Sequence, residues 1–344
     1  MVKCLVTGAG GFLGRYIAEQ LVLRGDTVRG LARGHYPELE SIGVEMRRAT
    51  IHDAVAVLDA CDGVDIVFHA AGIAGIWGKW RDYYETNTLG TRNVIAACRA
   101  RQVSRLVYTS SPSVTFDGRD QCNVDERAPY PKKWLCHYAH TKALAEQEAL
   151  AANEPGRLAT CSLRPHLIWG PRDNQLGPRL WDRARQGRLR LVGDGNNLID
   201  TIYVENAAAA HVAAAEALSR GSPVAGRAYF LTQGEPIPCG EWINRLLAVV
   251  GLPPERRAIP FRLAYSLGAL LEGVYTLTRL ESEPPMTRFL AAQLGKSHYF
   301  DTSRARRDFG FVPKVSTANG LERLARHISA NGERPPREST PQAT

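Results

Sequence analysis

The residues best suited to chemistry are a tyrosine and a lysine four positions apart, Tyr138 and Lys142. On a helix, that spacing puts both side chains on one face. A phenol with a pKa of about 10 is a poor base at neutral pH, but a neighbouring ammonium favours the phenolate. Tyr138 could therefore exchange a proton with a substrate oxygen while Lys142 lowers its pKa and holds a cofactor ribose. Such a pair suits the interconversion of a carbonyl and a hydroxyl group.

Hydroxyl groups gather just after a predicted strand at residues 104–109. We expect Ser111 to hold the substrate oxygen and to stabilise the charge that develops on it. Ser110 and Ser113 are alternative candidates for this role. All three hydroxyls could instead cap the end of the strand without contacting a substrate.

A glycine-rich turn near the N-terminus predicts a phosphate site. Gly8, Gly11 and Gly14 lie between a predicted strand at residues 2–7 and a predicted helix at residues 12–23. Gly8 permits a tight turn, Gly11 lets the backbone approach a pyrophosphate, and Gly14 lets the helix pack against the sheet. The helix N-terminus then faces the phosphate charge. The alternative is a flexible loop, but strand, turn and helix follow in the order that a dinucleotide site requires.

The end of the second predicted strand, at residues 27–32, indicates which dinucleotide binds. An acidic residue there would bond the ribose 2′-hydroxyl of NAD, but the position carries Ala32 and Arg33 follows it. A guanidinium pairs well with phosphate, so the sequence favours NADP(H), with NAD as the alternative. Arg33 could also be an ordinary solvated arginine. Further contacts expected around the cofactor are Phe12, Leu13, Ala70, Ala71, Gly72 and Thr109.

Strands and helices alternate through the first 165 residues, which predicts a parallel sheet with helices on both faces. We therefore expect an α/β fold, a Rossmann-type doubly wound sheet with a smaller C-terminal substrate lobe. The NADP(H)-binding core would cover residues 1–165, and the substrate lobe with late sheet elements would cover residues 166–330. Residues 331–344 are polar and rich in proline, and we expect them to be disordered. Single helices are expected at residues 83–101 and 137–153.

Composition limits the function classes. The seven cysteines form no CxxC motif, so we expect reduced thiols in a reducing, cytoplasmic compartment. The net charge of +8 is dispersed and no nucleic-acid module is evident, so we expect no nucleic-acid partner. No run of about 18 apolar residues suggests a membrane span. His137 and His140 have a spacing seen in metal sites, but no third ligand is evident, so we expect no metal.

Four motifs, in order along the chain, resemble those of the extended short-chain dehydrogenases/reductases. They are the glycine-rich turn at 8–14, residues 87–94, the Tyr138/Lys142 pair and residues 164–171. The resemblance covers the chain to about residue 325 and implies an NAD(P)-dependent oxidoreductase with Tyr138, Lys142 and Ser111 at the reacting end.

The same resemblance assigns further roles. It implies that Asn87 supports the active-site lysine and a water, although Asn87 could instead cap a helix start. It places Pro165 and Leu167 near the nicotinamide. Thr50 and Ile51 would lie near the adenine, with Thr50 where the family usually has an aspartate.

Within this family, residues 193–197 and 200–207 resemble the 3β-hydroxysteroid dehydrogenase-like branch. Residues 33–39, 77–78 and 185–195 are similar to bacterial reductases of olefin biosynthesis. That similarity implies NADPH-dependent, reversible reduction of a long-chain 2-alkyl-3-oxoalkanoic acid to the 3-hydroxy acid.

Three alternatives are a 3β-hydroxysteroid or sterol dehydrogenase, a sugar-nucleotide epimerase or dehydratase, and a non-catalytic NADP(H) sensor. Arg33 and the aromatic loop after the fourth strand argue against the second, and the intact Tyr138 and Lys142 argue against the third.

Aromatic residues predict an apolar substrate pocket. The substrate candidates are Trp77, Tyr83, Trp169 and Tyr203, although any one of them could be core packing. Arg164 and Arg179 are candidates to meet a substrate carboxylate, and a structural ion pair is the alternative for each.

Residues 261–280 resemble a region that associates with membranes in steroid-acting relatives, which predicts peripheral membrane contact. An ordinary buried helix of the small lobe is the alternative. The family also suggests a homodimer, and the substrate suggests contact with enzymes of the same lipid pathway.

Overall fold

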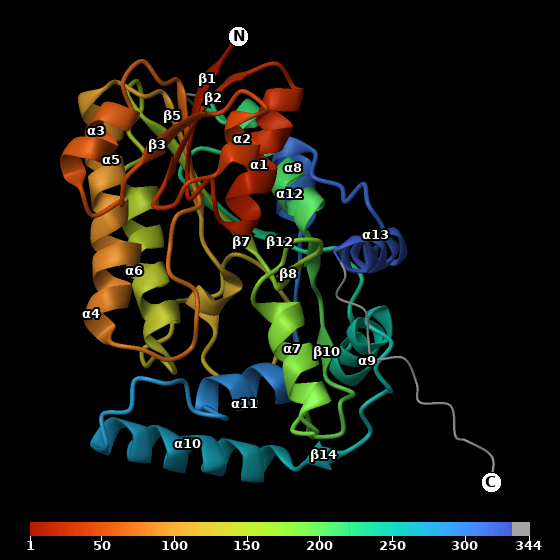
Figure 1. Cartoon of the computed structure of the whole chain (residues 1–344). Helices are drawn as coiled ribbons and strands as arrows, with labels where there is room; N and C mark the ends of the chain where they lie inside the picture. The colour runs from red at the N-terminus through yellow and green to blue at the C-terminus, as the bar shows by residue number, and fades with distance from the viewer. Residues whose placement is uncertain (220, 332–344) are drawn as a thin grey trace, which may run out of the picture.

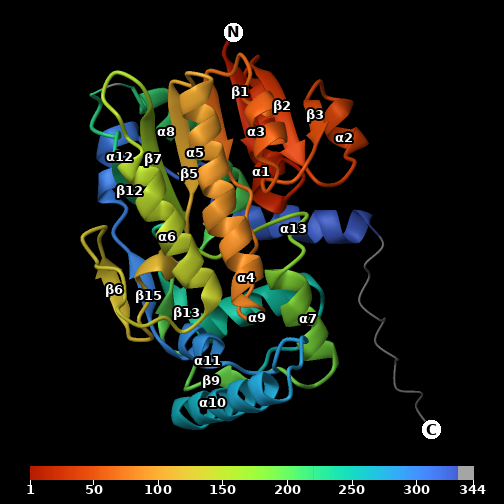
Figure 2. The same cartoon turned by 90° about the vertical axis from the view of Figure 1, so that its left-hand side faces the viewer.

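The computed structural model of the chain describes residues 1–219 and 221–331. At its centre lies a sheet of seven strands, and every neighbouring pair in it is parallel (Figures 1 and 2). In spatial order the strands are β12 (Arg227–Leu231), β7 (Ala159–Pro165), β5 (Arg105–Thr109), β4 (Ile66–His69), β1 (Lys3–Thr7), β2 (Thr27–Ala32) and β3 (Glu45–Arg48). The strand order reverses between β1 and β4, and the carboxyl ends there form the crevice in which such sheets bind ligands.

Helices cover both faces of this sheet, which confirms the doubly wound arrangement. One face carries α1 (Phe12–Leu23), α8 (Val204–Ala217) and α12 (Ser303–Phe309). The other carries α3 (Ala54–Ala60), α5 (Gly90–Ala100) and α6 (His137–Ala151), seen in front of the sheet in Figure 2. A short helix, α2 (Pro37–Glu40), precedes β3. Each face buries its own apolar cluster, so the strands between them are apolar along nearly their whole length.

The remaining elements form the smaller lobe, which lies below the sheet in Figure 1. Its helices are α7 (Leu176–Arg185), α9 (Cys239–Val249), α10 (Phe261–Leu277), α11 (Arg288–Gly295) and α13 (Thr317–Ala330). A second sheet joins β13 (Ile237–Pro238), β10 (Leu198–Ile199), β15 (His298–Phe300) and β6 (Gln121–Val124). Two strand pairs complete it, β8 (Ile168–Trp169) with β11 (Ile202–Tyr203) and β9 (Leu191–Val192) with β14 (Ala258–Ile259).

The chain crosses the boundary expected at residue 165 in both directions. β6 precedes that boundary but belongs to the lobe sheet, and β12 and α8 follow it but belong to the core. Of the predicted tail, residues 332–344 lie outside the described residues.

The helix predicted at residues 83–101 is interrupted. α4 (Trp80–Tyr83) leads into a π-helical segment, η1 (Tyr84–Leu89), and α5 continues from it. A π-helical turn holds one residue more than an α-helical turn and is frequent at functional sites. η1 packs against α6, so the irregular turn lies directly beside the helix that carries Tyr138.

The helix α10 corrects one expectation. Its partner is α11, and it buries only a narrow strip that includes Gly268 and Glu272. The side chains on its outer face are exposed, so the buried-helix alternative is wrong for this segment. They are Leu263, Leu267, Leu270, Val274 and Leu277. Within the described part of the chain, no helix is both long and apolar enough to cross a bilayer.

Candidate active site

One large cavity, with a volume of about 510 Å³, opens between the sheet and the lobe. It contacts the start of α1, the loops after β4, β5 and β7, and the helices α6, α7, α9 and α11. Most of its wall is aliphatic or aromatic. The predicted residues that line it are Phe12, Leu13, Ala70, Gly72, Thr109, Ser111, Tyr138, Lys142, Pro165 and Leu167.

The glycine-rich turn fits the pyrophosphate of a dinucleotide. Gly8 has φ +72°, and a Cβ on it would lie 2.8 Å from the Cα of Ala71. A Cβ on Gly14 would lie 2.1 Å from the Gly8 carbonyl oxygen, so a side chain at either position would clash with the backbone. Gly11 is the N-cap of α1 and has no side chain to shield the first free N–H groups of the helix.

The adenosine end carries two arginines at neighbouring strand ends. Arg33 follows β2 and is exposed, and within the described residues its guanidinium has no carboxylate partner. Arg48 pairs in register with Ala32, and its Nε donates to the Arg33 carbonyl oxygen over 3.1 Å. Sequence reasoning missed Arg48, because only the register of β2 with β3 brings it beside Arg33. Two cations at this edge suit a 2′-phosphate.

Thr50 and Ile51 follow β3, as expected. The Thr50 hydroxyl accepts a hydrogen bond from the His52 N–H over 3.3 Å. Ile51 is buried and packs so closely on Gly90 that a Cβ there would lie 2.6 Å from its terminal carbon. Ile51 therefore supports the fold at this end of the sheet.

The helix α6 places Tyr138 and Lys142 on the cavity wall. The Lys142 ammonium donates to the carbonyl oxygen of Thr109, 2.5 Å away, and lies 4.2 Å from the centre of the Tyr108 ring. Burial lowers the pKa of Lys142 to about 7, against the attraction of the Glu146 carboxylate. Burial raises the pKa of the Tyr138 phenol, and its hydrogen bond with Ser111 acts in the opposite direction. In the free cavity, therefore, burial keeps a proton on Tyr138, and Lys142 does not lower its pKa as we expected.

Asn87 joins this helix to the loop after β4. Its Oδ1 accepts the N–H of Ile73 over 2.8 Å, and its Nδ2 donates to the Ile73 carbonyl oxygen and to the Thr141 hydroxyl, each over 3.1 Å. Asn87 lies inside η1, so the alternative role of capping a helix start is wrong. A Cβ on Gly72 would lie 3.1 Å from the Asn87 Oδ1 and 3.9 Å from the Lys142 Nζ, which places all three side by side.

Of the three serines, Ser111 is the one paired with Tyr138. Its hydroxyl accepts the N–H of Ser113 over 3.2 Å, and the Ser113 hydroxyl donates to it over 2.9 Å. Ser111 therefore caps the short helix η2 (Pro112–Thr115) and also faces the phenol. Ser113 lies behind it as a supporting donor.

Of the two roles open to Arg164, the structure shows the structural ion pair and not contact with a substrate carboxylate. Its guanidinium is 3% exposed and binds the fully buried Glu146 carboxylate through both Nε and Nη2. The ion pair is structural, and it ties α6 to β7. Arg179 does line the cavity, but its charge is already compensated by Glu283.

The four aromatic substrate candidates do not line the cavity. Trp169 and Tyr203 are buried in the lobe core, with ring centres 5.1 Å apart. Tyr83 is buried and donates to the Trp77 carbonyl oxygen over 3.0 Å, while the Trp77 ring packs on Tyr275 of α10. The aromatic contacts to the cavity come instead from Phe116, Trp242, Phe289 and Phe300. Only the tertiary packing distinguishes the two sets.

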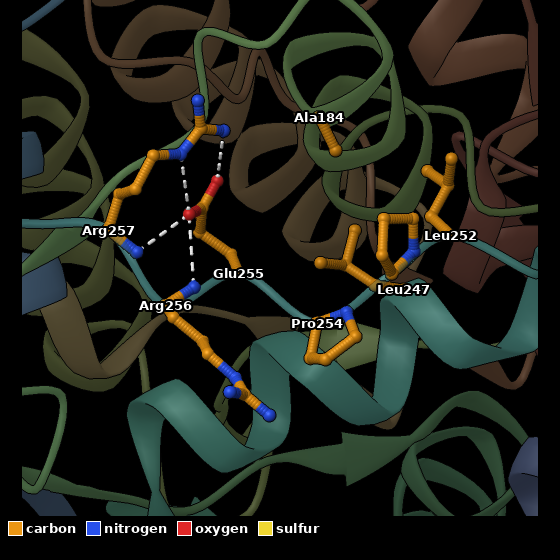
Figure 3. Close-up of a pocket in the computed structure, with 8 residues that line it drawn as sticks. Ala184, Leu247, Leu252, Pro254, Glu255, Arg256 and Arg257 are labelled. Carbon is orange, nitrogen blue, oxygen red and sulfur yellow. Dashed lines mark hydrogen bonds and ion pairs between the residues drawn. The ribbon is translucent and has the colours of Figure 1, made fainter.

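A second cavity of about 250 Å³ lies in the lobe, away from these groups (Figure 3). Its carboxylate, Glu255, already accepts from the N–H groups of Arg256 and Arg257 and from the Arg257 guanidinium. Its other walls are aliphatic, from Ala184, Leu247 and Leu252, so it offers no reacting group. Over the described residues, no three histidine, cysteine, aspartate or glutamate side chains are placed to hold a metal ion.

Known proteins resemble this chain in sequence and in fold. Residues 5–262 match the 3-beta hydroxysteroid dehydrogenase/isomerase family. A 2-alkyl-3-oxoalkanoate reductase from Stenotrophomonas maltophilia is 53% identical over 326 residues, covering 94% of this chain and 98% of the relative. A mouse sterol-4-alpha-carboxylate 3-dehydrogenase (decarboxylating) is 35% identical, covering 93% and 89%. The structure of a dTDP-glucose 4,6-dehydratase from Streptomyces venezuelae matches with a TM-score of 0.75 at 22% identity, covering 96% and 98%.

The fold and the site define a nicotinamide-dependent oxidoreductase of the extended short-chain dehydrogenase/reductase type. Within that class, the chain belongs to the 3-beta hydroxysteroid dehydrogenase/isomerase family.

Proposed function

We propose that this protein is an NADPH-dependent reductase that converts a long-chain 2-alkyl-3-oxoalkanoic acid to the 3-hydroxy acid, reversibly. The observation that carries the proposal is the placement of Tyr138, Ser111 and Lys142 on the wall of a large, mainly apolar cavity. The 53% identity with a 2-alkyl-3-oxoalkanoate reductase, over nearly the whole of both chains, supports this substrate class.

Each polar group has a separate task in this proposal. Tyr138 gives its proton to the substrate oxygen in reduction and takes it back in oxidation. Ser111 donates to the same oxygen and stabilises the charge that develops on it. Lys142 holds the cofactor ribose, and Asn87 fixes the loop and the helix that frame the lysine. The bound nicotinamide supplies the hydride.

The glycine-rich turn would hold the pyrophosphate, and Arg33 with Arg48 would hold the 2′-phosphate of NADPH. We also propose a cytoplasmic protein that contacts membranes peripherally through the exposed face of α10. A long-chain substrate would partition into membranes, which gives such contact a purpose.

The test is NADPH oxidation by the purified protein with a long-chain 2-alkyl-3-oxo acid. The alcohol product is quantified as well, because 3-oxo acids lose CO₂ spontaneously. Oxidation of NADPH with matching formation of the 3-hydroxy acid supports the proposal. If the protein turns over 3β-hydroxysterol 4-carboxylates and not the oxo acid, the second candidate function, a sterol dehydrogenase, would be supported. The same residues would then act on a sterol, as the similarity to sterol dehydrogenases favours.

A further inference from the structure

One part of the cavity wall consists of polar side chains that the proposed mechanism does not use. Gln121 on β6 and His298 on β15 are partners in register on adjacent parallel strands. Both side chains line the cavity, and they are only 7% and 1% exposed. His166 lines the same cavity directly after Pro165, and its ring meets the His298 ring edge-on with centres 4.8 Å apart.

Each of the three side chains has used its hydrogen-bond donor elsewhere. Gln121 donates through Nε2 to the carbonyl oxygen of Thr115, 3.0 Å away. His298 has Nε2 2.7 Å from the carbonyl oxygen of Gln293, and a carbonyl only accepts, so Nε2 carries the hydrogen. The Gln121 Oε1 and the His298 Nδ1 are buried acceptors without a donor in the described residues.

His166 follows the same rule. Its Nδ1 lies 2.5 Å from the carbonyl oxygen of Asp200 and must carry the hydrogen, which leaves a lone pair on Nε2. Burial places the pKa of His166 well below its usual range, with His298 acting in the same direction, and burial also lowers the pKa of His298. Both rings are therefore neutral in the free protein, and this wall offers three acceptors.

A wall of acceptors selects the ligand group that can meet it. A buried acceptor without a donor is unfavourable, so the wall favours a ligand that brings a hydrogen. A bare carboxylate would add two more acceptors. A carboxyl group can bind there only with a proton, carried on its own oxygen or on an imidazole.

We infer that His166, His298 and Gln121 form the subsite for the substrate carboxyl group, and that this group binds together with one proton. The inference rests on the proposed function. In a 2-alkyl-3-oxo acid the carboxyl is attached next to the reacting carbonyl carbon, so its subsite must adjoin Ser111 and Tyr138. His166 lines the same cavity as Ser111 and Tyr138. The proton is shared between a carboxyl oxygen and His166 Nε2, and the two other acceptors favour the protonated form.

The charged groups that face this subsite are engaged in other contacts, so the proton has to arrive with the ligand. The Asp200 carboxylate accepts the N–H groups of Thr201 and Gly234, and its backbone oxygen holds His166. Asp120 is the acid that acts on His298. Elsewhere on the wall, Asp173 accepts the N–H groups that open α7, and Lys142 and Tyr138 are engaged at the reacting end. Three arginines also line the cavity: Arg179 is paired with Glu283, and Arg183 and Arg190 donate to backbone carbonyl oxygens.

The experiment measures proton uptake on binding. The protein with NADPH, which cannot react with an alcohol, is titrated calorimetrically at pH 7 with the 2-alkyl-3-hydroxy acid, in two buffers of different ionisation enthalpy. The methyl ester of the same acid is the matched ligand without an ionisable group. We expect uptake of close to one proton for the acid and none for the ester. The His166→Gln variant should lose the uptake and the His327→Gln variant, remote on α13, should keep it.

Kinetics give an independent readout. For the wild type, the ratio of kcat/KM for the oxo acid to that for its methyl ester should fall about tenfold per pH unit above the pKa of the free acid, because kcat/KM reports the ionisation of the free reactants. His166→Gln should flatten that dependence. The inference would be overturned if this ratio did not change with pH, or if the acid bound without proton uptake. It would also be overturned if Arg179→Gln lost the preference for the acid and His166→Gln kept it.

The two proposals fail separately. If the oxo acid is not reduced at all, the proposed function fails, while calorimetry with the hydroxy acid still decides the subsite. If the oxo acid is reduced but binds without a proton, only the subsite is wrong. Should His166→Gln not fold, the wild-type comparison of acid with ester remains decisive.

Discussion

Burial favours the neutral form of both reacting side chains, Tyr138 and Lys142. It raises the pKa of Tyr138 and lowers the pKa of Lys142 to about 7, so each is pushed towards its neutral form. Near pH 7 the free cavity therefore presents a protonated phenol, which is the form that gives a proton to a carbonyl oxygen.

The Tyr138→Phe substitution tests the proton transfer. It removes one hydroxyl from a cavity-facing ring, so we expect loss of turnover by at least about two orders of magnitude, with NADPH binding nearly unchanged. Steady-state rates and a fluorescence titration with NADPH measure the two properties. Turnover that survives in this variant would remove Tyr138 from the mechanism.

Arg33 provides a test of cofactor choice. Arg33→Ala should raise KM for NADPH about tenfold, the size of one charged contact, and leave KM for NADH nearly unchanged. Arg48→Ala should act in the same direction, because its guanidinium lies at the adjoining strand end. Equal effects on both nicotinamides would show that neither arginine meets the 2′-phosphate.

The sequence predicts residues whose role follows from local spacing. Tyr138 and Lys142 share a helix face at any position in a fold, and the glycine-rich turn carries its own conformational requirement. His166 and Gln121 belong to segments that meet only through the register of β6 with β15 and the edge-on packing of two imidazoles. For Arg164 the sequence could not decide between substrate contact and a structural ion pair, because its partner Glu146 is identified only by the packing of α6 on β7.

At the scale of elements, α6 and β7 are tied by that buried ion pair. The Glu146 carboxylate accepts from Arg164, Ser162 and Tyr130, and neither member of the pair is more than 3% exposed. Burial raises the pKa of Glu146, and Arg164 more than offsets this, so the carboxylate remains charged below its usual pKa. The pair holds the helix that carries Tyr138 at a fixed height over the sheet.

Glu146→Gln should therefore destabilise the protein by about 3 kcal/mol or more, since it leaves the buried Arg164 charge uncompensated. Urea unfolding followed by circular dichroism measures this loss. The matched control is Glu85→Gln, which breaks the exposed pair with Arg81 and should cost less than about 1 kcal/mol. Equal losses in the two variants would contradict the structural role.

Element prediction succeeded where periodicity is regular and failed where packing overrides it. The bounds of α1 and β2 were predicted to the residue, because a strict apolar pattern ends at a turn. The break between α4 and α5 left no trace in the helical spacing, since a π-helical turn depends on contacts with α6 and the loop after β4. The exposure of α10 could not be predicted either, because the sequence pattern of an apolar helix is the same whether its outer face is buried or exposed to solvent.

At the scale of the whole molecule, the exposed face of α10 gathers several large apolar side chains on the surface of the lobe. Its five exposed aliphatic residues recur every three or four positions, so they form one stripe along the helix. Arg262 lies in the first turn of this helix, and Arg279 follows its end. An apolar stripe with cationic ends is suited to the interface of an anionic bilayer.

Replacing Leu267, Leu270 and Val274 with serine should reduce sedimentation with anionic phospholipid vesicles several-fold, without changing the secondary structure. The matched control replaces Leu23 and Val55, which are exposed on the core to a greater extent, and should sediment like the wild type. Sedimentation that is unaffected by the α10 substitutions would leave the stripe without a membrane role.

The π-helical turn η1 limits which deletions this chain can accept during evolution. It contains one residue more than a regular helix would, and that extra residue sets the direction in which Asn87 points. Deleting one residue of η1 that precedes Asn87 would restore an unbroken helix and improve its local regularity. It would also turn Asn87 by about 100° away from Ile73 and Thr141. A one-residue gap here would therefore mark a homologue that has kept the fold and lost the framing of its lysine.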